Sequence, residues 1–178
     1  MNSTFLCIDL DGTLIRNDTL QLALWQFVGK SPTRLLKVLG WLLRGRAYLK
    51  RQIAERITLD ASQLPYNAAF LTWLKIEKQL GHKLILVSAT DQKYADAVGI
   101  YLGIFDEVIA SNGKINLRSH NKAAELNRRY GKNNYIYAGN SSADLPVWRN
   151  AKAAVVVNAS SHLLSRAEKV ASVIKIFG

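Results

Sequence analysis

The chain is poor in cysteine and in acidic residues, and it has no long hydrophobic run. Cys7 is the single cysteine, which excludes an intramolecular disulfide, and its place in an apolar segment predicts a small core residue rather than a nucleophile. An apolar stretch at residues 35–43 contains Lys37 and is too short to span a bilayer. No basic stretch leads into a long apolar core near the start, so we expect no signal peptide. These absences predict a cytoplasmic protein.

The shortage of acidic residues leaves a large positive charge, since 13 acids stand against 24 lysines and arginines. The excess is concentrated in residues 16–56, where Asp18 and Glu55 are the acids. Within it, residues 34–44 combine cations, leucines and Trp41. Such a helix could rest on an anionic membrane with Trp41 at the interface, or pack its apolar face inside the protein while its cations stay in water. Nucleic acid is the less favoured partner, because no recognised binding motif accompanies the charge.

Strand and helix patterns alternate along the chain, which predicts an α/β fold with a Rossmann-like parallel sheet and helices on both faces. With 178 residues, 49% hydrophobic and 21% charged, the chain suits one globular unit. Residues 17–59 hold no good strand pattern; helical spacing runs through residues 20–28 and again from Leu35 to about Ile57. We therefore predict a core of residues 1–15 and 65–178, with a small α-helical insertion, residues 16–64, after the first strand.

Two carboxylates, Asp9 and Asp11, follow the first buried strand pattern directly, in Asp9-Leu10-Asp11-Gly12-Thr13-Leu14. The end of a strand is the usual ligand position in open α/β sheets. Two carboxylates this close repel each other unless a cation neutralises one of them or their pKa values differ widely. Mg²⁺, which binds oxygen ligands, would supply the neutralising charge. One acid could then attack phosphorus while the other handles protons. The plainer alternative is a strand followed by an ordinary Asp-Gly turn.

That hexapeptide resembles the first motif of the haloacid dehalogenase-like hydrolases, most of which are Mg²⁺-dependent phosphatases. Three later segments resemble the remaining motifs in the family's order: residues 84–90 with Ser88 and Ala89, residues 121–124 with Lys122, and residues 135–144 with Asn140 and Asp144. In this family the helical insertion is a cap over the nucleophile.

The resemblance implies a role for each matching residue. Asp9 would form an aspartyl-phosphate and Asp11 would serve as acid and base, while Ser88, Ala89 and Lys122 would bind the phosphoryl group of a small phosphorylated substrate. Mg²⁺ would be held by Asp9, Asp11, Asn140 and Asp144. Asn140 departs from the family, which usually has an aspartate there, and the missing charge should weaken metal binding.

A narrower resemblance concerns residues 41–45, 64–67 and 143–148. They are similar to a phosphatase-like domain found in some bacterial proteins ahead of UbiA-type integral-membrane prenyltransferases. This implies a sugar phosphate or a polyprenyl-linked phosphosugar as substrate, and contact with an anionic membrane or a membrane prenyltransferase at the inner face of the membrane. The alternative is a phospho-ligand-binding or regulatory module of low activity, which Asn140 makes credible.

Overall fold

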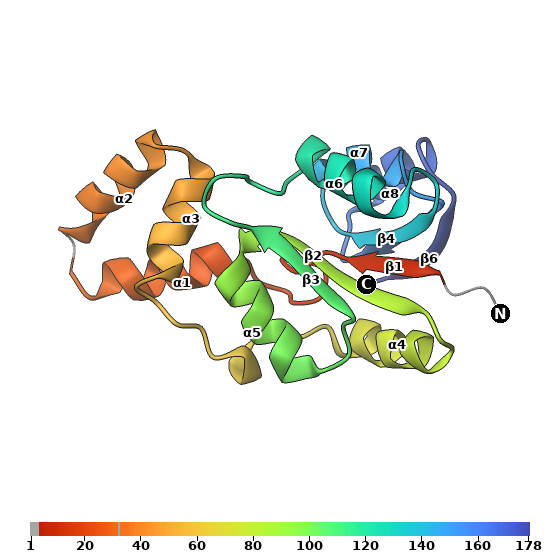
Figure 1. Cartoon of the computed structure of the whole chain (residues 1–178), viewed down its shortest axis with the longest axis horizontal. Helices are drawn as coiled ribbons and strands as arrows, with labels where there is room; N and C mark the ends of the chain where they lie inside the picture. The colour runs from red at the N-terminus through yellow and green to blue at the C-terminus, as the bar shows by residue number, and fades with distance from the viewer. Residues whose placement is uncertain (1–3, 32) are drawn as a thin grey trace.

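A parallel six-stranded sheet forms the centre of the computed structural model, which describes residues 4–31 and 33–178 (Figure 1). The strands lie in the order β3-β2-β1-β4-β5-β6, and each neighbouring pair is parallel. In chain order they are β1 (Phe5–Ile8), β2 (Lys83–Asp91), β3 (Glu107–Ser111), β4 (Tyr135–Gly139), β5 (Ala153–Val157) and β6 (Val173–Phe177). The predicted α/β class with a Rossmann-like sheet is confirmed.

Helices connect the strands and cover both faces of the sheet, α4 and α5 on one face and α6, α7 and α8 on the other (Figure 1). The helices are α1 (Thr19–Gly29), α2 (Arg34–Leu43), α3 (Arg46–Ala54), α4 (Ala68–Gln79), α5 (Gln92–Leu102), α6 (His120–Tyr130), α7 (Leu145–Trp148) and α8 (Ser161–Glu168), with the 3₁₀ helices η1 (Ala61–Gln63) and η2 (Ser142–Asp144). Among the described residues, no helix is both long and apolar enough to cross a membrane.

The apolar strands bury both of their faces, as expected for a parallel sheet covered on two sides. Because successive side chains point to opposite faces, Leu6 and Ile8 of β1 join the cluster under α4 and α5, whereas Cys7 joins the cluster under α6, α7 and α8. Cys7 is fully buried, and burial raises the pKa of its thiol. The cysteine is therefore an unreactive core residue.

The strand order reverses beside β1, which fixes where a ligand can bind. The chain places β2 and β3 on one side of β1 and then returns to place β4, β5 and β6 on the other. The loops that follow the carboxyl ends of β1 and β4 consequently run in opposite directions. The crevice between them, called a topological switch point, is the usual ligand-binding position in open α/β sheets.

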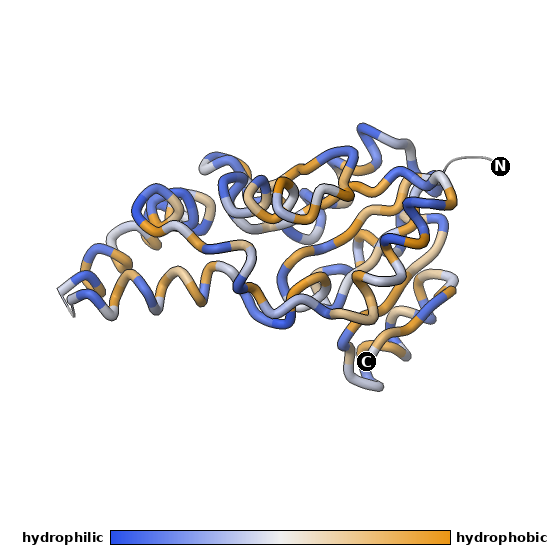
Figure 2. The backbone as a smooth tube through the Cα atoms, turned by 90° about the horizontal axis from the view of Figure 1, so that it is seen from below, coloured by the Kyte–Doolittle hydropathy of each residue, from blue (hydrophilic) through white to orange (hydrophobic). Residues whose placement is uncertain are grey.

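Helices α1, α2 and α3 form a separate helical cap between β1 and η1, and Figure 2 shows this part projecting from the sheet region. The cap has an apolar cluster of its own, centred on Phe27 and Ile53 and closed against Tyr94 of α5. The exact boundaries, residues 16 and 64, stay a prediction.

The helix predicted from Leu35 to about Ile57 is in fact two helices, because the chain turns at Arg44 and Gly45 between α2 and α3. Gly45 has φ +105°, a conformation that side-chain-bearing residues rarely adopt, so a glycine here ends one helix and starts the next. Trp41 of α2 is turned inward: its ring lies 5.3 Å from that of Phe27, and the Arg56 guanidinium lies over it. Trp41 therefore packs against the apolar cluster of the cap, as the second of the two alternatives for this helix expects.

Candidate active site

The two acids of the first motif lie on a tight loop at the end of β1. Gly12, at the turn of this loop, has φ +77°, and a Cβ on it would stand 2.0 Å from Nδ2 of Asn140. The missing side chain lets Asn140, which follows β4, lie directly against the Asp9–Asp11 loop. A glycine is therefore required both for the turn and for this close approach.

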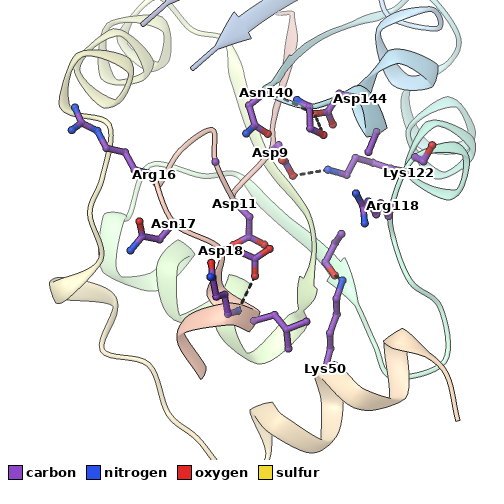
Figure 3. A pocket seen from close by; sticks show the side chains of 17 residues that line it. Asp9, Asp11, Arg16, Asn17, Asp18, Lys50, Arg118, Lys122, Asn140 and Asp144 are labelled. Atoms are coloured by element: carbon purple, nitrogen blue, oxygen red, sulfur yellow. Dashed lines mark hydrogen bonds and ion pairs between the residues drawn. The ribbon is translucent and has the colours of Figure 1, made fainter. Parts of the chain in front are cut away.

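A pocket of about 410 Å³ opens above this loop (Figure 3). Six of the seven predicted site residues line it, namely Asp9, Asp11, Ala89, Lys122, Asn140 and Asp144. Ser88 lies beneath the surface instead: it is fully buried, and its hydroxyl accepts a hydrogen bond from the main-chain N–H of Thr90 at 3.0 Å. The hydroxyl proton of Ser88 remains available for donation.

A continuous chain of hydrogen bonds joins Asp9 to Asp144 through two intervening side chains. Lys122 donates to Oδ1 of Asp9 at 2.6 Å and to the hydroxyl of Tyr137 at 2.8 Å, and Tyr137 donates to Oδ1 of Asp144 at 2.8 Å. The other oxygen of Asp144 accepts from the main-chain N–H groups of Asn140 and Ser141 and from the Ser141 hydroxyl. The network thus fixes the ammonium of Lys122 beside Asp9 in a buried place.

Both acids of the first motif are buried enough to disfavour their charged forms. Burial raises the pKa of Asp9 to about 6, although the Lys122 ammonium acts in the opposite direction. Burial also raises the pKa of Asp11 to about 7, with the nearby charge of Asp18 adding to the rise. A cation in this pocket would offset both penalties.

Asp11 also links the core to the cap. Its Oδ1 accepts a hydrogen bond from the main-chain N–H of Thr19 at 2.8 Å, at the N-terminus of α1, where a carboxylate is favoured. The hydroxyl of Thr19 in turn lies 2.6 Å from that of Thr90 on β2. The start of the cap is therefore held against the Asp9–Asp11 loop.

Sequence reasoning missed three cations and a tyrosine of this site. Lys50 reaches into the pocket from α3, and Arg16 and Arg118 also line it (Figure 3). The Lys50 ammonium donates to the carbonyl of Ala89 and, at 3.0 Å, to Oδ1 of Asn116, and burial lowers its pKa to about 8. The surplus of cations in residues 16–56 was a signal for Arg16 and Lys50, but it did not say which cations of that segment line the pocket, and Arg118 lies outside the segment. Tyr137 gave no signal, because a tyrosine in a strand normally indicates packing.

The oxygen donors at the end of β1 fit a hard divalent cation. Lys122 binds Oδ1 of Asp9, and Asn140 is held against the same loop by its approach to Gly12. No cluster of three or more His, Cys, Asp or Glu side chains arranged to hold a metal occurs in the part of the chain that the structure describes. The available carboxylate, main-chain carbonyl and amide oxygens are therefore suitable ligands for Mg²⁺. This set of ligands carries less negative charge than one made of carboxylates alone.

Comparison with known proteins finds a family whose model matches most of the chain. The model of the haloacid dehalogenase-like hydrolase family matches residues 6–149. A protein of Sinorhizobium fredii called y4nM, which is uncharacterized, is 38% identical over 152 residues; these are 85% of this chain but 29% of that protein. The chain therefore spans less than a third of the length of this relative.

Solved structures share the fold across nearly the whole chain. A substrate-bound phosphoserine phosphatase has a TM-score of 0.68 at 15% identity, covering 99% of this chain and 93% of its own. A phospho-aspartyl intermediate analogue of phosphoserine phosphatase has a TM-score of 0.66 at 14% identity, with 99% and 94% covered. A protein of unknown function from Bordetella pertussis reaches 0.71 at 13% identity, with 99% of both chains covered. At these identities the likeness shows the fold alone.

Proposed function

Because the chain belongs to the haloacid dehalogenase-like hydrolase family, we propose that it hydrolyses phosphomonoesters through an aspartyl-phosphate on Asp9. One observation carries the proposal: Lys122, which is 113 residues from Asp9 in the sequence, lines the same pocket as Asp9 and Asp11, at the switch point of the sheet. The phosphoserine phosphatases among the similar structures, one of them a phospho-aspartyl intermediate analogue, support it.

The first step transfers the phosphoryl group to the protein. A carboxylate oxygen of Asp9 attacks phosphorus, the bond from phosphorus to the leaving oxygen breaks, and protonated Asp11 gives that oxygen its proton. Lys122 uses two of its three N–H donors on Asp9 and Tyr137, which leaves one for a phosphoryl oxygen. The ammonium therefore neutralises charge on the group being transferred while it orients the nucleophile.

The second step releases phosphate. Asp11, now ionised, takes a proton from a water molecule as that water attacks phosphorus, and the bond between phosphorus and Asp9 breaks. Bound Mg²⁺ would supply charge neutralisation at the phosphoryl oxygens. Asp9, the main-chain carbonyl of Asp11 and Asn140 would hold the ion, with Asp144 supporting the main chain at Asn140 and Ser141.

The substrate we propose is a sugar phosphate or a polyprenyl-linked phosphosugar presented close to a membrane. Arg16, Lys50 and Arg118 place three further cations around the pocket, which favours a substrate with a second anionic group beyond the scissile phosphate. The phosphodiester that joins a sugar to a polyprenyl chain is such a group. The resemblance of residues 41–45, 64–67 and 143–148 to prenyltransferase-fused domains also supports this choice, with a membrane prenyltransferase as the neighbouring enzyme.

The direct test is Mg²⁺-dependent hydrolysis of p-nitrophenyl phosphate by the wild type, by Asp9→Asn and by Asp96→Asn. Asp96 is an exposed acid on α5, so its amide variant controls for the loss of one carboxylate. We expect hydrolysis that chelation and Asp9→Asn abolish and Asp96→Asn retains, together with a hydroxylamine-labile phosphoprotein in the wild type. Full activity in Asp9→Asn would refute the proposal.

Asn140 supports a second candidate function, a module that binds a phosphorylated ligand with little turnover. The amide leaves the metal-binding loop with less negative charge than the family's usual aspartate would give. Asn140→Asp separates the two functions. Turnover that rises in Asn140→Asp indicates an attenuated enzyme, whereas phosphate-ester binding without turnover in either form indicates the binding module.

A further inference from the structure

Helix α2 presents a row of leucines to solvent. Leu36, Leu39 and Leu43 follow one another at i, i+3 and i+7 and so share one side of the helix, with Leu35 beside them. Their exposed fractions are 73% for Leu36, 51% for Leu39, 90% for Leu43 and 51% for Leu35. We refer to these four residues as the leucine face. Contiguous exposed apolar side chains of this kind mark a surface that binds something.

The leucine face is not needed to hold the cap together. The opposite side of α2 does this, with Val38 buried in the cap cluster and Trp41 packed on Phe27. α2 lies at the outer end of the cap, away from the sheet (Figure 1). Among the described residues, none of the four leucines belongs to the apolar cluster of the cap, and a partner would account for their exposure.

The charges around the leucine face indicate that its partner is negatively charged. Lys37 and Arg44 lie on α2 and directly after it, and both are exposed, as are Lys30 and Arg46 nearby. The sequence from residue 19 to residue 54 contains no acidic residue at all. A partner must therefore combine an apolar layer with negative charge at its edge, as an anionic bilayer does.

We propose that the leucine face docks the cap onto an anionic membrane, with α2 lying in the plane of the lipid headgroups. Four leucines would enter the boundary of the acyl chains while Lys37 and Arg44 meet lipid phosphates. A second copy of this chain fits less well, because a two-fold contact through this face would bring the cations of both copies together.

Docking would also set the position of the pocket. α3 follows α2 after the Gly45 turn, packs against it, and carries Lys50 into the pocket. A membrane-bound α2 would therefore hold the pocket near the bilayer surface. This last consequence rests on the proposed function, whereas membrane binding itself does not.

The test is co-sedimentation of the whole chain with vesicles of phosphatidylcholine alone and of phosphatidylcholine mixed in equal parts with phosphatidylglycerol. The test variants are the double change Leu36→Gln and Leu43→Gln, and the single change Lys37→Glu. The matched controls change exposed residues outside the cap: Ile100→Gln replaces an apolar residue and Lys132→Glu replaces a cation. Hydrolysis of p-nitrophenyl phosphate in solution is measured for every variant.

We expect wild-type protein to bind the mixed vesicles at low salt and to bind phosphatidylcholine vesicles weakly. The leucine double variant should lower the partition coefficient by about tenfold or more, while Ile100→Gln leaves it unchanged. Lys37→Glu should lower it more than Lys132→Glu does, and added salt should reduce that difference. The soluble assay should not change, so failure of membrane binding is distinguishable from failure of the proposed hydrolysis.

Three results would overturn the proposal. One is a folded wild type that does not sediment with the mixed vesicles at low salt. Another is binding that the leucine variant retains in full. A third is a concentration-dependent dimer that the leucine variant abolishes without any vesicle binding, which would assign the face to a second copy of the chain.

Discussion

Removing the Tyr137 hydroxyl, in a Tyr137→Phe variant, tests whether the buried network holds the active site in place. The hydroxyl accepts a hydrogen bond from Lys122 and donates one to Asp144, each at 2.8 Å, and the side chain is fully buried. The change leaves Oδ1 of Asp144 without that donor, and Lys122 keeps its bond to Asp9. Since hydrogen bonds to charged groups are worth about 1.5–3 kcal/mol, we expect a loss of about 2–3 kcal/mol in the free energy of unfolding.

Tyr135→Phe is the matched control, because Tyr135 is also fully buried on β4. Its hydroxyl donates to the neutral side chain of Asn127 at 3.1 Å, away from the pocket. Loss of one neutral hydrogen bond should reduce the free energy of unfolding by about 1 kcal/mol. Urea denaturation of both variants, at equal m-values, measures the difference.

Tyr137→Phe and Tyr135→Phe should also differ in kcat. Without the Tyr137 hydroxyl, the Lys122 ammonium keeps its bond to Asp9 but loses its second anchor and can shift, and misplacement of a positioning group costs roughly tenfold to a hundredfold in kcat. Tyr135→Phe should keep the wild-type kcat. The reasoning is refuted if Tyr137→Phe is no less stable than Tyr135→Phe and hydrolyses p-nitrophenyl phosphate at the wild-type rate.

Three further predictions concern the pocket. Gly12→Ala should lower the free energy of unfolding by about 1–3 kcal/mol, because the residue has φ +77° and a Cβ would collide with Asn140. The control Gly40→Ala, at a helical position with open space around it, should raise the free energy of unfolding slightly. Urea denaturation measures both changes. Asn140→Asp should lower the Mg²⁺ concentration for half-maximal hydrolysis by about tenfold, and an unchanged titration would contradict the proposed metal position. Because the pKa of Lys50 is lowered to about 8, the KM for a substrate with a second anionic group should be constant below that pH and rise above it. Lys50→Arg, which stays charged, should remove the rise, and an identical rise in Lys50→Met would exclude Lys50 as its cause.

Local patterns were sufficient to predict much of this protein. The strand before Asp9, the acids after it and the helical insertion that follows are each written in a few neighbouring residues. Period-2 and period-3.6 spacing gave the alternation of strands and helices, and hence the α/β class, because these periods follow directly from backbone geometry. The break between α2 and α3 was missed, although Gly45 is visible in the sequence, because many helices tolerate an isolated glycine.

The site itself was predictable only as a set of candidates. Lys122 lies 113 residues from Asp9 in the chain, and the two meet only because β1 and β4 are neighbours and α6 packs on the face between them. The family resemblance identified Lys122 as a candidate, but it could not identify Tyr137, whose role depends on the direction of one hydroxyl. Lys50 belongs to a run of cap cations that look alike in sequence, and only the packing of α3 turns it into the pocket.

The sequence by itself determined the pair of acids at the end of β1, the parallel α/β architecture and the positive charge of the cap, because each depends on nearby residues or on composition. Tertiary structure alone decided which apolar side of α2 is inside. Trp41 and Leu43 are both apolar and lie only two positions apart, yet one packs on Phe27 and the other is exposed. Hydrophobicity sets how much surface a helix tends to bury, whereas the position of the neighbouring helices sets which surface that is.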